Sequence, residues 1–173
     1  MAIYALGDVE PTIDPTAYIH PDAVVIGQVT IGAESSVWPS AVLRGDPGGI
    51  VIGARTSIQD GTVVHTTPAT PTRIGDECVI GHLVHLEGCT IGNGSLVGSG
   101  ATVLNGAVLE DECLVGAGAL VPGHLTVPHR AMAIGVPATL KLDAVRPEVH
   151  IRVGMEVYRE RGRSYRDQLR RLD

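Results

Sequence analysis

A large aliphatic residue recurs every six positions along most of this sequence, and that period restricts the chain to very few folds. Three successive aliphatic positions make a unit of 18 residues, and we name them the first, second and third side of the unit. Short insertions at residues 47–50 and 68–72 interrupt the period without ending it. The positions that follow it are Ile13, Ile19, Val25, Ile31, Val37, Leu43, Ile52, Ile58, Val64, Ile74, Ile80, Leu86, Ile91, Val97, Val103, Leu109, Val115, Val121 and Val127.

Small residues follow most of these aliphatic residues at a distance of four positions. A large side chain in each short strand and a small one near each corner let a three-sided coil close around a narrow core, and such coils stack into a parallel β-helix. The absence of phenylalanine agrees with so narrow an interior. Glycine directly after the aliphatic residue, as at Gly32 and Gly53, is expected to provide permissive backbone at the bends.

The period predicts an all-β domain over residues 1–137, a parallel β-helix of about six to seven coils. Residues 138–173 lose the six-residue period and take up helical spacing. We therefore expect a C-terminal α-helix that packs on the prism. The residues that carry this spacing are Tyr158, Tyr165, Leu169 and Leu172.

Several single residues have structural interpretations. Trp38 follows the second-side Val37, so its side chain points outward, and we expect a partner or the C-terminal tail to cover it. Three histidines near turns and at the end of the repeat are interpreted as surface or capping residues. They are His20, His124 and His129.

Composition and charge exclude several classes of function. Up to residue 139 there are only four arginines against thirteen acidic residues, which argues against binding of nucleic acid. No apolar stretch has the length of a signal sequence or a membrane span, so we expect a cytoplasmic protein that does not bind membranes. Cys78, Cys89 and Cys113 have no metal or redox spacing, and an odd number of thiols favours a reducing compartment.

Four short motifs go beyond the repeat. They are RGD (residues 44–46), IQDG (58–61), VH (64–65) and GHLVHLEGC (81–89). Together they resemble the γ-class carbonic anhydrase family of the hexapeptide-repeat superfamily, over about residues 10–140. The resemblance implies a left-handed β-helix and a homotrimer with a metal ion between subunits. It also implies a lyase that hydrates CO2 reversibly to bicarbonate by means of a metal-bound hydroxide.

The repeat places the chemical residues in two outward columns. Arg44, His65 and Glu87 follow third-side aliphatic residues, whereas Asp60 and His82 lie at the corner after the second side. A threefold assembly would press the corner of one prism against the side of its neighbour, and the two columns would then meet. Two imidazoles, one carboxylate and an open position are typical of catalytic Zn2+, with Fe2+ or Co2+ as alternatives.

The third metal ligand is where this sequence departs from the family. Family members usually have histidine at the position of Glu87, and this chain has His85 two residues earlier. Either Glu87 is the ligand, or His85 takes its place, or both contact one ion. A carboxylate ligand makes the site less positive and its bound water less acidic.

Further roles follow from the resemblance. Gln59 matches a residue near the metal-bound solvent, and Arg44, Asp46 and Asp60 match residues that pair across the subunit interface. The loop after His65 contains no carboxylate, so buffer or His85 would have to carry the proton. Two alternative functions remain at this stage: an acyl-CoA-dependent acyltransferase with a histidine base, and a catalytically weak metal-binding scaffold.

Overall fold

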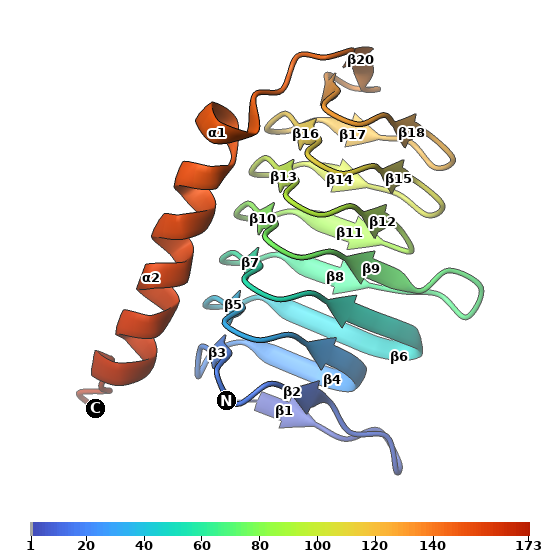
Figure 1. The fold of residues 1–173 in the computed structure, drawn as a ribbon. Coiled ribbons are helices and arrows are strands. Elements are labelled where there is room, and N and C mark those ends of the chain that lie inside the picture. Colours follow the sequence, from blue (N-terminus) through green and yellow to red (C-terminus); the bar gives the residue numbers. More distant parts are fainter. Residues whose placement is uncertain (1) are drawn as a thin grey trace.

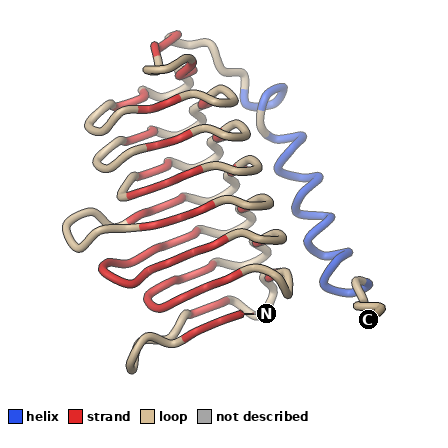
Figure 2. The backbone as a smooth tube through the Cα atoms, turned by 180° about the vertical axis from the view of Figure 1, so that it is seen from behind, coloured by secondary structure: helices blue, strands red, loops and turns tan. Residues whose placement is uncertain are grey.

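The computed structural model describes residues 2–173, and its short strands stack into a prism of about seven coils with a helix alongside (Figure 1). The predicted left-handed parallel β-helix is confirmed. The interior is built from the six-residue period, since every aliphatic position in it is buried except Ile13, which is half-buried. Figure 2 shows the same stack from behind, with loops at the corners and the helix along one flank.

The second side of the prism is a sheet of its own. Its strands pair in parallel, except that the last one is added antiparallel at the C-terminal end. In chain order they are β3 (Tyr18–Ile19), β5 (Ser36–Val37), β7 (Ser57–Ile58), β10 (Val79–Ile80), β13 (Leu96–Val97), β16 (Leu114–Val115), β19 (Met132–Ile134) and β20 (Thr139–Lys141).

The first and third sides form one larger sheet, because β4 (Val24–Ile31) and β6 (Val42–Ile52) pass from the third side to the first without a break. The insertion at residues 47–50 lies within β6. The third side also contains β1 (Ala2–Tyr4), β8 (Val63–His65), β11 (His85–Glu87), β14 (Thr102–Val103) and β17 (Leu120–Val121). The first side also contains β2 (Thr12–Ile13), β9 (Thr72–Ile74), β12 (Thr90–Ile91), β15 (Val108–Leu109) and β18 (Thr126–Val127).

Glycine after the aliphatic positions allows close packing between coils. A Cβ atom on Gly32 would lie 2.6 Å from the carbonyl carbon of Gly53 in the next coil. The expectation that these glycines provide unusual backbone conformations is wrong. The left-handed residues come two positions later in the corner, at Glu34 (φ 56°) and Arg55 (φ 54°).

The C-terminal helix covers the second side. It follows the single turn α1 (Pro147–His150), and α2 (Arg152–Gln168) runs along β3, β5 and β7. The rings of Tyr158 and Tyr165 lie 5.5 Å and 5.1 Å from the ring of Trp38, which is only 4% exposed. The sequence left two ways to cover this tryptophan, a partner or the C-terminal tail. In the structure the tail covers it.

The helix ends before the last two residues of the predicted helical spacing, Leu169 and Leu172. It ends at Gln168, Leu169 has extended backbone angles, and Leu172 is 84% exposed. The helix runs from the C-terminal end of the prism toward its first coils and ends beside them (Figure 1). Among residues 2–173, no helix is both long and apolar enough to cross a membrane.

Candidate metal centre

His65 and Glu87 lie side by side at the end of the third side. β8 and β11 pair so that Glu87 is opposite His65, and both side chains point outward because they follow the buried Val64 and Leu86. His65 Nδ1 lies 3.3 Å from Glu87 Oε1. The two side chains are 18% and 29% exposed, so the pair is shielded but accessible from the surface.

Asp46 connects Arg44 to this pair. The Arg44 guanidinium donates a hydrogen bond to Asp46, whose other oxygen lies 3.3 Å from His65 Nε2. Desolvation opposes ionisation of Asp46, but hydrogen bonds from Arg44 and His65 outweigh it and hold the pKa of this carboxyl below its ordinary value. Both ring nitrogens of His65 thus face carboxylates, and Arg44 reaches the imidazole only through Asp46.

His85 lies in the neighbouring outward column of the same side. It pairs with Val63 in the preceding coil and with Thr102 in the following one. Its Nε2 atom is 3.5 Å from Glu87 Oε2, and its side chain is 40% exposed. The two oxygens of Glu87 are therefore divided between two imidazoles, His65 on one and His85 on the other.

His82 and Asp60 form a second group at the corner between the second and third sides. His82 Nδ1 lies 2.9 Å from Asp60 Oδ2, and the two side chains are 45% and 46% exposed. His82 Nε2 lies 3.3 Å from the hydroxyl of Tyr158. The sequence patterns did not identify Tyr158 as a site residue; its only signal was its place on the apolar face of the tail.

The two groups do not meet within one chain. Gln59, which follows β7, is 4% exposed, and its side chain makes no hydrogen bond to any residue that the structure describes. Within residues 2–173, no three histidine, cysteine or acidic side chains are arranged to hold a metal ion. The donor types suit a divalent ion, but within one chain His82 lies apart from the group of His65 and Glu87.

The outward faces of the three sides differ in how far they are covered and in how polar they are. The second side is covered by α2. On the third side, Val24, Val42 and Val63 stack in register beside the His65 pair, and Val63 is 37% exposed. The first side carries mostly threonine in the corresponding column: Thr12, Thr30, Val51, Arg73, Thr90, Val108 and Thr126.

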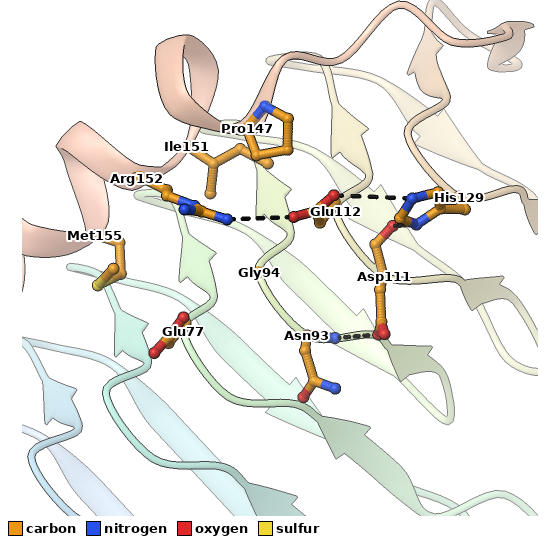
Figure 3. Close-up of a pocket in the computed structure, with 10 residues that line it drawn as sticks. All are labelled: Glu77, Asn93, Gly94, Asp111, Glu112, His129, Pro147, Ile151, Arg152 and Met155. Atoms are coloured by element: carbon orange, nitrogen blue, oxygen red, sulfur yellow. Dashed lines mark hydrogen bonds and ion pairs between the residues drawn. The ribbon is translucent and has the colours of Figure 1, made fainter.

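A separate pocket of about 350 Å³ lies between the helix and the corner that joins the first and second sides (Figure 3). Its acids already have partners. Glu112 lies 2.7 Å from Arg130 and 3.5 Å from Arg152, and Asp111 accepts a hydrogen bond of 2.7 Å from the backbone of Asn93. The hydrogen bond from Arg130 lowers the pKa of Glu112. These contacts hold the corner to the helix, and we assign them a structural role.

The fold and the histidine–carboxylate groups together define a left-handed β-helix protein of the hexapeptide-repeat class. Residues 71–105 and 88–123 match the family described as bacterial transferase hexapeptide (six repeats). The carnitine operon protein CaiE of Escherichia coli K12 is 37% identical over 150 residues, which cover 87% of this chain and 76% of CaiE. A solved structure of a hexapeptide transferase family protein from Anaplasma phagocytophilum is 35% identical, with a TM-score of 0.89 over 95% of this chain and 98% of that one.

A third relative carries the name that the motifs suggest. Gamma carbonic anhydrase 2, a mitochondrial protein of Arabidopsis thaliana, is 41% identical over 137 residues, which cover 76% of this chain and 49% of the plant protein. This chain thus spans about half of that relative's length. It belongs to the γ-carbonic-anhydrase-like family of the hexapeptide-repeat superfamily.

Proposed function

We propose that this protein catalyses the reversible hydration of CO2 to bicarbonate as a homotrimer. A divalent ion, Zn2+ or in its place Fe2+ or Co2+, would be held by His65 and Glu87 of one subunit and by His82 of the next. The observation that carries the proposal is the in-register His65–Glu87 pair, together with a His82 whose Nδ1 atom is held by Asp60. Carboxylate-supported imidazoles of this kind are typical of metal ligands.

Each residue of the two groups has a task in this proposal. The bound ion would supply Lewis acidity, which makes hydroxide available near neutral pH. Asp60 fixes the His82 tautomer, and the Arg44–Asp46 pair holds the His65 ring. Gln59 would orient the attacking oxygen by hydrogen bonding. His85, which is 40% exposed, would pass the released proton to buffer, because the loop after His65 offers no carboxylate.

The surface of the prism supports association through the third side. In the single chain Val63 is exposed and Val24 and Val42 are half-buried, whereas the second side already carries the helix and the first side is largely polar. Apolar side chains on a flat uncovered face favour contact with another subunit. A threefold arrangement through this side would place each metal group next to a neighbouring corner.

The test combines metal content with CO2 hydration. Purified wild-type protein should be a trimer that contains up to one metal ion per subunit and accelerates CO2 hydration. His65→Ala should lose both properties, whereas His124→Ala, which changes a histidine outside the two groups, should keep both. A wild-type trimer with metal and no hydration would favour a metal-binding scaffold. Transfer from acetyl-CoA without metal would favour an acyltransferase; the solved relative from Anaplasma phagocytophilum is named a hexapeptide transferase family protein.

A further inference from the structure

We propose that Tyr158 occupies the metal-binding nitrogen of His82 when no metal is present, and that an arriving ion displaces it. Helix α2 would then respond to metal binding at the neighbouring corner. This inference rests on the proposed function, because it takes His82 as a metal ligand. It assigns to the C-terminal helix a role in the site beyond its packing on the prism.

The protonation of His82 follows from its two contacts. Asp60 Oδ2 lies 2.9 Å from Nδ1, and a carboxylate at this distance favours the tautomer with the proton on that nitrogen. Nε2 then has the free lone pair, and the Tyr158 hydroxyl, 3.3 Å away, is the donor that faces it. A metal ion needs the same lone pair. The hydroxyl and the ion cannot both use it.

Tyr158 is not free to swing away without consequence. Its ring packs edge-on against Trp38 at 5.5 Å, with an interplanar angle of 78°. Trp38 is itself fixed, since its Nε1 atom donates to the hydroxyls of Ser36 at 2.9 Å and Ser57 at 3.0 Å. Movement of the tyrosine hydroxyl therefore changes the surroundings of the buried indole. Trp38 is the single tryptophan of the chain, so all tryptophan fluorescence comes from this site, and the Tyr165 variant shows how much of a change belongs to the other ring on the indole.

The experiment measures Zn2+ and Co2+ affinity of the purified trimer by competition with a chelator, alongside tryptophan fluorescence. Tyr158→Phe keeps the ring and removes the hydroxyl, so it should bind metal about fivefold more tightly, the worth of one ordinary hydrogen bond. Added metal should change the fluorescence of the wild type and change that of Tyr158→Phe much less. Tyr165→Phe is the matched control, because its ring also packs on Trp38 and does not contact His82.

Two further measurements separate competition from a general effect on folding. Circular dichroism should give the same helix content for both tyrosine variants and the wild type. In a His82→Ala background, Tyr158→Phe should leave any residual affinity unchanged. If Tyr158→Phe, with His82 intact, binds metal no more tightly than the wild type does, the inference is overturned. A wild-type trimer that binds no metal overturns the proposed function, and this inference with it.

Discussion

Glu87 is the residue that distinguishes this site from one made of three imidazoles. It is in register with His65, whereas His85 belongs to the next outward column. Its two oxygens face different histidines, at 3.3 Å and 3.5 Å. This arrangement favours one of the alternatives left open by the sequence: Glu87 binds the ion with one oxygen, and His85 holds the other oxygen. Outer partners of this kind orient a ligand and raise metal affinity.

Substitution of these two residues separates the alternatives. Glu87→Gln should abolish stoichiometric metal binding, because the amide carries no charge and is a poor ligand. His85→Ala should keep the stoichiometry and lower the affinity by about tenfold, the usual effect of losing an outer partner. Metal per subunit after gel filtration and chelator competition give the two quantities. The reverse pattern, with binding lost in His85→Ala and kept in Glu87→Gln, assigns the ligand to His85.

At the scale of elements, α2 contains two glycines in opposite surroundings. Gly154 has no atom within 4 Å of the place where a Cβ would lie, whereas a Cβ on Gly162 would lie 3.3 Å from Ser36 Cβ on β5. The first glycine only weakens the helix, since glycine loses more backbone entropy than alanine. The second lets the helix come close to the second side.

Alanine at each position should therefore have different effects on stability. Gly154→Ala should raise the free energy of unfolding by about 0.5–1 kcal/mol. Gly162→Ala should give no such gain, because the added methyl group presses on β5. Urea unfolding followed by circular dichroism at 222 nm measures both. An equal gain in the two variants would mean that the helix does not sit against β5 in solution.

Glu34 links the same helix to the prism through Arg159 and Arg163. The hydrogen bond from Arg163, opposed in part by desolvation, leaves the pKa of Glu34 below its ordinary value of 4.5. A carboxyl whose pKa is lowered on folding stabilises the protein above its unfolded pKa, and the effect is lost as the pH falls through the folded pKa.

Glu34→Gln should accordingly lower the thermal midpoint at pH 7, and the difference from wild type should vanish under acidic conditions below that lowered pKa. Glu10→Gln is the control, since Glu10 is exposed and forms no ion pair with any described residue. Thermal scans from pH 7 to pH 3 follow the difference. A difference that persists unchanged at pH 3 would show that the charge of Glu34 is not its cause.

Much of the scaffold could be predicted from the sequence because one residue in six decides it. The aliphatic period assigned the interior, and from the interior it assigned the outward columns that contain His65 and Glu87. The period carries no information about which side the tail covers. That choice depends on aromatic contacts between Trp38 and residues over a hundred positions later, so the approach of Tyr158 to His82 was not predictable.

At the scale of the whole molecule, the proposed trimer uses the third side of the prism and leaves the first side free. Two valines with equal exposure test this difference. Val63 on the third side and Val51 on the first are both 37% exposed. Val63→Glu should produce monomers without bound metal, because in the proposed trimer a charge on the third side loses its water on association. Val51→Glu should remain a metal-containing trimer. Light scattering gives the mass, and a trimer formed by Val63→Glu would place the interface elsewhere.

The prism closes its C-terminal end with a change of strand direction. β20 pairs antiparallel with β19, after a second side in which every earlier neighbour is parallel. An uncovered edge of a parallel stack is a template on which the next molecule can add its own first strand. A reversed strand does not continue the coil, so on the second side it offers no parallel edge for the first strand of another molecule.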